Sequence, residues 1–433
     1  MSLAKFAEWL QKMEEVNLPF DIHEPQWMSD LRKLHWQAWC ENGLPTHQHE
    51  RFKYTDFSFL MNQSYTRIER TCSDPLKEIV EQHRLRKKEH ILLVLVNGYF
   101  EPSLSDVTKL LMQKGKLIAS SLNEAIIDYP ALFKQHWPKQ IDTATFPFVS
   151  LNRSRWTDGL FLYLMDHCEL KETIHILSIA TQKECVAHPH HILVLGEKSQ
   201  LTFFEEHLSL VDQFYLMNQV STITLGKGAQ LDHYKLQQEG EQAIHLAHVF
   251  VEQSEDSHAR FSTFSFGSTF ARDDLIVQLQ ESGSAIHTSG FYRLNKKNQY
   301  IDHHVEINHL APYSQSEMFY KGMIEQPARA VFNGRLHVAK GAEKIIAHQA
   351  NHNLLIHPEA EVYTKPELEI YADDVKCTHG ATIGQLDEEM LFYLQSRGIS
   401  REEAQLMTSC AFADEIVQRI QHEDVKLKVQ EWL

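Results

Sequence analysis

The first third of the chain carries apolar residues at helical spacing, interrupted by one continuous apolar run. Asn42-Gly43 predicts the end of one helix, and Ser121 with Glu124 predicts a capping box at the start of another. The run HILLVLV at 90–96 precedes Asn97-Gly98, which predicts a buried strand ending in a tight turn. We therefore predict a mixed, mostly helical domain at residues 1–147, which begins with an apolar stripe at Leu3, Phe6, Leu10 and Met13.

From about residue 148 the pattern changes to short apolar runs broken by Gly, Asn, Asp or Ser. An apolar residue, a turn, a small residue and a second apolar residue follow one another in LVLGEKSQL (193–201), ITLGKGAQL (223–231) and LIHPEAEV (355–362). VQLQESGSAI and LHVAKGAEKI are looser versions of this pattern. Repeated strand–corner–strand units build the coils of a solenoid, whereas an antiparallel sandwich gives no reason for the same corner to recur. We predict a parallel β-helix core at residues 148–383.

Capping signals divide residues 384–433 into helices. Asp387 predicts the start of one helix and Gly398 its end. Ser400 with Glu403 forms a second capping box. The helix that follows carries an apolar stripe at Leu406, Met407, Cys410, Ala413, Val417 and Ile420. We predict a helical C-terminal domain that closes the solenoid or docks a partner.

Charge and composition narrow the classes of partner. The formal net charge of −16 disfavours nucleic acid and anionic membranes as partners, and the basic stretch 84–88 is predicted to be a solvated helix face. The longest apolar run, at 91–96, is far shorter than the roughly 20 residues of a membrane span, and the N-terminus does not resemble a secretory signal. These features predict a cytoplasmic protein. Its six cysteines include no C-x-x-C pair, which predicts free thiols rather than a self-contained zinc or iron–sulfur site.

Cys377 and His379 form the strongest candidate for chemistry. Residues i and i+2 of a strand lie on one face, so both side chains could reach one ion. A closed zinc site needs four ligands, so any metal here needs further ligands from elsewhere in the fold or from another chain. Ordinary strand residues are the alternative from spacing alone, and a nucleophile with its base is a weaker one because a rigid strand holds both groups side by side.

The remaining motifs indicate no catalytic centre. HPHH at 188–191 is predicted to be a loop, and His348 and His352 have ligand spacing only on a helix, whereas the repeat predicts a strand there. The chain has no Walker A motif, no G-x-G-x-x-G turn and no G-x-S-x-G elbow. We therefore expect no ATP site in this chain.

A resemblance to a known family covers nearly the whole sequence. The segment TKPELEIYADDVKCTHGATIGQLDEEMLFYLQSRGIS at 364–400 resembles the C-terminal region of the SufB/SufD family, and of its SufD branch in particular, whose members are subunits of the SUF iron–sulfur cluster assembly machinery. Similar segments lie upstream, at FKYTDFSFL, LVNGYFEPSLS, DGLFLYL and LDHYKLQQEG. SufB typically has glutamate after the matching histidine, so Gly380 after His379 favours SufD.

The resemblance implies a right-handed parallel β-helix between a mixed N-terminal and a helical C-terminal domain. It implies a non-catalytic scaffold in complex with SufB and the ATPase SufC, with iron or a transient iron–sulfur cluster held at the SufB boundary. The family histidine maps onto His379, and Cys377 occupies the preceding, less certain cysteine position. We expect the C-terminal helices to dock SufC through Leu391, Tyr393, Leu406 and Met407.

Several alternatives accompany this interpretation. Reduced FAD, proposed for complexes of the family, would belong to the assembly. A homodimer through the SufB-facing surface is the alternative assembly for the isolated chain. A β-helix polysaccharide hydrolase or lyase and a purely structural solenoid are the alternative functions, and only the scaffold predicts a stable ternary complex.

Overall fold

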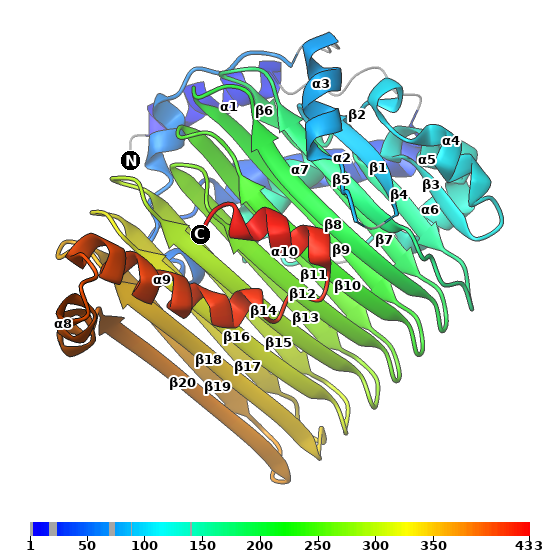
Figure 1. The fold of residues 1–433 in the computed structure, drawn as a ribbon. Coiled ribbons are helices and arrows are strands. Elements are labelled where there is room, and N and C mark those ends of the chain that lie inside the picture. Colours follow the sequence, from blue (N-terminus) through cyan, green and yellow to red (C-terminus); the bar gives the residue numbers. More distant parts are fainter. Residues whose placement is uncertain (1–2, 17–23, 69–73, 88, 139–140) are drawn as a thin grey trace.

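The protein is built on a β-solenoid of about eight coils (Figure 1). This computed structural model describes residues 3–16, 24–68, 74–87, 89–138 and 141–433. The first sheet contains, in spatial order, β2 (Tyr99–Phe100), β1 (His90–Val96), β5 (Thr173–Ala180), β8 (Gln200–Ser209), β10 (Gln230–Gln238), β12 (His258–Ser265), β14 (Ala285–Leu294), β16 (Gln315–Ile324), β18 (Ile345–Leu355) and β20 (Val375–Gln385).

The second sheet faces the first across the core. It runs through β19 (Glu361–Ile370), β17 (Arg329–Val338), β15 (Tyr300–His309), β13 (Phe270–Leu279), β11 (Ala243–Gln253), β9 (Tyr215–Leu225), β7 (His190–Leu195), β4 (Leu160–Leu164) and β3 (Leu117–Ser121), with β6 (Val186–Ala187) beside β9. From β8 onward the chain alternates between the sheets, and strands of successive coils pair in parallel. The predicted mainly-β solenoid is therefore confirmed.

The register repeats at almost constant distance along the chain. Gln230 pairs with His258, an offset of 28 residues, and Gln315 pairs with Ile346, an offset of 31. Because side chains alternate between the faces of a strand, this register stacks like positions of every coil. The inward positions form the main apolar cluster, which runs from Ile91 to Ala360.

Small buried residues mark one corner of the coils. The apolar pairs predicted from the repeat stack on one another, since Leu231 pairs with Leu201 and Leu225 with Leu195. LIHPEAEV differs: it lies at the opposite corner, between β18 and β19, whereas the two other segments connect the second sheet to the first. The first kind of corner carries a buried small residue in coil after coil, at Ser199, Ala229, Ser257, Ser284, Ser314 and Ala342.

The N-terminal region covers the start of the solenoid and the outer face of its second sheet. Its helices and 3-10 turns are α1 (Leu3–Val16), α2 (Gln26–Asn42), η1 (Glu50–Phe52), η2 (Ser58–Asn62), α3 (Asp74–His83), η3 (Pro102–Leu104), α4 (Val107–Met112), α5 (Leu122–Asp128) and α6 (Pro130–His136). Gly43 ends α2 with φ of +69°, and Ser121 forms its capping box with Glu124, as predicted.

Two features of this region differ from the sequence prediction. Helix α7 (Pro147–Arg155) opens the segment assigned to the β-helix and is buried along its whole length, while β1 and β3 from the N-terminal segment extend the two sheets. The basic stretch 84–88 was predicted to be a helix face, but its described residues follow the end of α3, and Lys88 falls outside the described residues. Arg84 pairs with Asp106 and Lys87 with Glu423, so these two charges have partners within the chain.

The C-terminal segment forms α8 (Glu388–Ser396), α9 (Arg401–Val417) and α10 (Glu423–Gln430) (Figure 1). Asp387 caps α8, Gly398 follows that helix with φ of +90°, and Ser400 forms the predicted capping box with Glu403. The second half of α9 and α10 pack on the outer face of the first sheet, where Ala413, Ile416, Val417, Val425 and Val429 meet Phe264, Phe291 and Phe319. Among the described residues, no helix has both the length and the apolar character that a membrane span requires.

Candidate functional site at the open end of the solenoid

Cys377 and His379 lie on β20, the terminal strand of the first sheet. Cys377 pairs with Ala347 and His379 with Gln349, and both partners are buried inside the solenoid. Side chains in register on parallel strands share a face, so Cys377 and His379 point toward the axis of the solenoid. They are therefore the last inward residues of the stacked core rather than part of its outer surface.

The two side chains have different environments. Cys377 is half-buried against the apolar core, and this burial raises the pKa of its thiol, which favours the neutral form. His379 is exposed, because β20 is the last strand of its sheet in the part of the chain that the structure describes. Below it, Gln349 donates a hydrogen bond of 2.9 Å to the carbonyl of Gly334. Within the described ranges, no three His, Cys, Asp or Glu side chains are arranged to hold a metal ion.

The last coil leaves both backbone and apolar surface uncovered. Strands β19 and β20 each have one neighbour among the described residues, so one edge of each strand has no strand beside it. The inward side chains of β19 are mostly half-buried and those of β20 mostly exposed, and Ile370 and Ile383 are 38% and 53% exposed. An edge of this kind is a template for pairing with another chain, and the apolar end of the core gains stability when it is covered.

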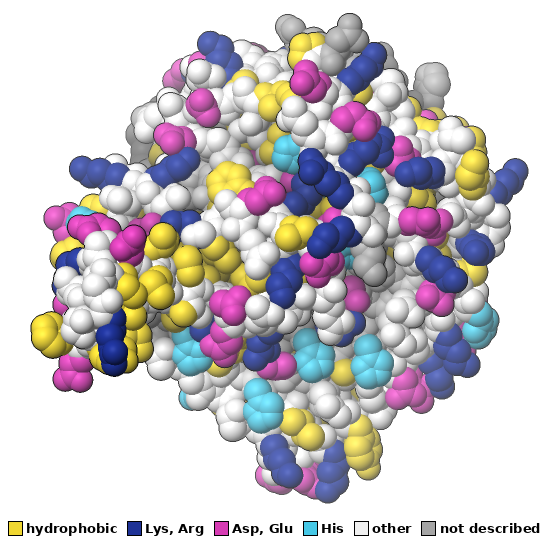
Figure 2. Space-filling view, viewed as in Figure 1, with side chains coloured by type: hydrophobic (Ala, Val, Ile, Leu, Met, Phe, Trp, Pro, Cys, Tyr) yellow, Lys and Arg dark blue, Asp and Glu magenta, His cyan; other side chains and the backbone are white. Residues whose placement is uncertain are grey.

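A second exposed apolar surface lies at α8 and the start of α9. Figure 2 shows apolar side chains gathered at this edge of the molecule, and we call the set Met390, Phe392, Tyr393, Leu406 and Met407 the helical patch. Its members are between 49% and 72% exposed. Leu391, predicted to belong to this docking surface, is instead fully buried and cannot touch a partner. The predicted stripe of α9 is split in the same way, because Leu406, Met407 and Cys410 face solvent while Ala413 and Val417 pack on the sheet.

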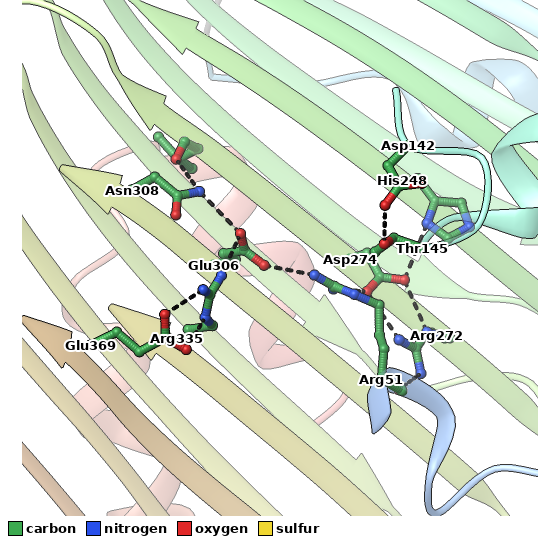
Figure 3. A network of polar contacts seen from close by, with 11 residues as sticks. Arg51, Asp142, Thr145, His248, Arg272, Asp274, Glu306, Asn308, Arg335 and Glu369 are labelled. Atoms are coloured by element: carbon green, nitrogen blue, oxygen red, sulfur yellow. Dashed lines mark hydrogen bonds and ion pairs between the residues drawn. The ribbon is translucent and has the colours of Figure 1, made fainter. Parts of the chain in front are cut away.

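A groove of about 1530 Å³ crosses the outer face of the second sheet. Figure 3 shows its charged floor, where Arg51 of η1 bridges Asp274 and Glu306 at 2.9 and 2.7 Å. Arg335 continues this chain of charges from Glu306 to Glu369. Each guanidinium is paired with carboxylates of this chain, so the network fastens the N-terminal segment to β13, β15 and β17. This network could not be predicted from the sequence, because its charged residues are distributed over several strands that lie far apart along the chain.

The histidines of the two other motifs lie on strands or directly after one. His190 and His191 begin β7 and are buried, so the predicted loop at HPHH is wrong for these two residues, and burial lowers the pKa of His191 to about 4. His348 and His352 lie on β18, as the repeat predicted. Their Nδ1 atoms contact the hydroxyls of Thr378 and Thr382 on β20, at 2.8 and 2.7 Å.

Comparison with known proteins covers most of the chain. Residues 178–412 match the family described as SUF system FeS cluster assembly, SufBD core domain, and residues 7–176 match the SufBD protein N-terminal region. The iron-sulfur cluster assembly protein SufD of Escherichia coli is 31% identical over 93% of this chain and 91% of its own length. A SufBD family protein of Synechocystis, slr0076, is 29% identical over 87% of this chain and 84% of its own.

The similarity extends to the other branch of the family at lower identity. SufB of Bacillus subtilis is 22% identical over 90% of this chain and 85% of its own length. A family match over more than half of the residues, with a relative above 30% identity across nearly the full length, leaves no doubt of membership. The chain belongs to the SufBD family of iron–sulfur cluster assembly proteins of the SUF system.

Proposed function

We propose that this chain is a non-catalytic, SufD-type scaffold subunit whose last coil joins a SufB-type chain, with iron or a nascent iron–sulfur cluster held between them. One observation carries the proposal: His379 is an exposed imidazole on the terminal strand, on the inward face, at an end of the core that no further coil of the described residues covers. A neutral imidazole is a good ligand for iron. Two side chains complete no coordination shell, so the partner would supply the remaining ligands.

Within this proposal His379 is the principal ligand and Cys377 the secondary one. The raised pKa of the Cys377 thiol makes it a ligand only when a metal displaces its proton. The cluster is cargo that leaves the complex. Reduced FAD, if the assembly uses it, would belong to the complex, and no residue of this chain is assigned to it.

The test is substitution of His379 in cells that express the partners. His379→Ala should leave the complex assembled and lower its cluster content at least about tenfold, because even the loss of a residue that only supports a metal ligand costs about 10–100-fold in metal affinity. His348→Ala is the matched control, because His348 is also exposed, on the neighbouring strand, but points outward. Normal cluster content in the His379 variant would refute the assignment, and loss of the complex in both variants would show a structural effect.

The helical patch is the proposed docking surface for a SufC-type ATPase, with residues 384–433 as the docking unit. Tyr393, Leu406 and Met407 supply apolar contact area, and buried Leu391 supports them from beneath. The double patch variant, Met407→Ser with Tyr393→Ser, should abolish co-purification of the ATPase while the fold is kept. Leu111→Ser on α4, where Leu111 is 68% exposed, is the control for a general effect of removing surface apolar area. Retention of the ATPase by the double patch variant would contradict the proposal.

The remaining alternatives separate in the same experiments. Family membership argues against a polysaccharide hydrolase or lyase. A purely structural solenoid would assemble normally and would lose nothing when His379 is replaced. A homodimer of the isolated chain through the last coil would dissociate when a SufB-type partner is added.

A further inference from the structure

One row of side chains crosses the outer face of the first sheet from the C-terminal helices to the free edge. Lys321 of β16 pairs in register with His352 of β18, and His352 pairs with Thr382 of β20. Toward the centre of the sheet the row continues through Phe291 and Phe264, which lie beneath α9 and α10. Its last member, Thr382, is three residues from His379 on the same strand.

The helical end of this row is a buried cation. The side chain of Lys321 is 6% exposed, and its ammonium donates to the carbonyl of Phe412 at 2.9 Å, pairs with Glu415 and lies 4.3 Å from the ring of Phe412. All these partners belong to α9. A buried ammonium with such partners holds its position tightly, because separation would leave the charge without compensation. Lys321 is therefore a firm attachment between α9 and the sheet.

The edge of the row is held by few contacts. The outward face of β20 carries two glycines, Gly380 and Gly384, so its attachment to β18 through side chains depends on Thr378 and Thr382. His352 contacts Thr382 at 2.7 Å and packs its ring 5.7 Å from that of Phe319. Burial and then the charge of Lys321 lower the pKa of His352, while the charge of Glu415 raises it. The imidazole therefore interacts electrostatically with both members of the ion pair that attaches α9.

We propose that Lys321, His352 and Thr382 are positioning residues that couple α9 to the strand carrying His379. When α9 shifts, Lys321 shifts with it, the contact between His352 and Thr382 weakens, and β20 loses one of its two outward tethers. The inference rests on the proposed function for its consequence, because a partner on the helical patch would then influence the ligand at the open end. The coupling itself requires neither partner nor cluster.

The sheet provides a matched control for this row. His348 and Thr378 make the same contact at 2.8 Å on the same two strands. His348 lies across from Glu317, whose partner Arg419 follows the end of α9 and is 38% exposed, in contrast to the buried Lys321. The two contacts share their chemistry and their pair of strands. They differ in attachment to the helix and in depth, because His348 is exposed and His352 is half-buried.

Amide hydrogen exchange of residues 375–385 in the full chain tests the coupling. Lys321→Met and Thr382→Val should each accelerate exchange about five- to tenfold, as a coupling of 1–1.4 kcal/mol implies. The double variant should exchange no faster than the faster single variant, because both remove one pathway. Thr382→Ser keeps the hydroxyl and should exchange at the rate of the parent chain. The effects of Thr378→Val and Lys321→Met on the exchange rate should instead add.

Nuclear magnetic resonance titration of His352 gives an independent measurement. Lys321→Met should raise the pKa of His352, whereas Glu415→Gln should lower it. Glu415 is 57% exposed and glutamine keeps an oxygen that can accept from Lys321, so Glu415→Gln is the milder of the two changes. Unchanged exchange of β20 in both Lys321→Met and Thr382→Val would overturn the proposal. Additive effects of these two substitutions would overturn it as well. Either outcome leaves the assignment of His379 intact, because that assignment is tested by cluster content.

Discussion

Gly322→Ala should destabilise the solenoid next to its open end. Gly322 of β16 pairs with Tyr292 of β14, and Gly290 pairs with Tyr320, so each ring occupies the space left by the opposite glycine. A Cβ at Gly322 would lie 2.0 Å from Cε2 of Tyr292 and 2.5 Å from Oδ1 of Asn353. Both neighbours are buried, and the hydroxyl of Tyr292 donates to Asn353 at 2.6 Å. The ring therefore has no free space into which it could move.

The magnitude follows from three effects. Overpacking of a filled core costs about 1–3 kcal/mol, and displacement of the ring weakens a buried hydrogen bond by about 1 kcal/mol. Replacing a strand glycine by alanine returns about 0.5–1 kcal/mol through the entropy of the unfolded chain. The free energy of unfolding should thus fall by about 2 kcal/mol.

Urea unfolding followed by circular dichroism measures this change. The midpoint should fall at unchanged slope, and Gly322→Ala combined with Tyr292→Leu should recover part of the loss, because the shorter side chain removes the ring atom that meets the new Cβ. Gly380→Ala on β20 is the control, since a Cβ there meets nothing within 4 Å. Equal midpoints for the two alanine variants would refute the steric argument.

Three further predictions concern other parts of the molecule. The pKa of Glu206 lies well below its usual range because hydrogen bonds from His175 and His83, with the charge of Lys428, outweigh its burial. Its stabilising contribution is therefore complete above the unfolded pKa of about 4.5 and is lost as the pH falls below it. Glu206→Gln should flatten the loss of thermal stability between pH 5 and pH 3, and an unchanged slope would contradict this. Ser400→Ala removes the capping box of α9 and should cost about 1 kcal/mol, seen as faster amide exchange confined to the first turn of that helix. Gly98→Ala should cost about 1 kcal/mol in thermal unfolding, because φ is +83° at this turn, and no loss would show that the turn adjusts freely.

Local signals in the sequence predicted local structure well. The caps at Asp387 and Ser400 were predicted correctly because a cap depends on side chains within three residues. The corner repeat identified the solenoid because each coil must bury the same positions. By contrast, α7 is buried on all sides by α2 and the second sheet, and nothing within its own nine residues reveals those neighbours.

The candidate site was predictable in part for the same reason. Strand periodicity places Cys377 and His379 on one face, but whether that face points inward depends on the register with β18, some thirty residues earlier. The division of α9 had no local signal either. Leu406 and Ala413 belong to one apolar stripe in the sequence. Ala413 is covered because it packs on the first sheet, whereas Leu406 remains exposed.

The in-register stacking of coils constrains how this protein can change in length. Inserting one residue inside a strand would turn every following inward side chain of that strand outward, so single-residue insertions and deletions are tolerated at corners alone. Corners already differ in size, with four residues between β11 and β12 and six between β17 and β18. Larger changes should occur in whole coils of 26 to 32 residues, as in the registers from Ile244 to Phe270 and from Arg329 to Glu361. Relatives of different length should therefore differ in steps of that size, and each should keep β20, the strand that carries His379, as the last strand of its sheet.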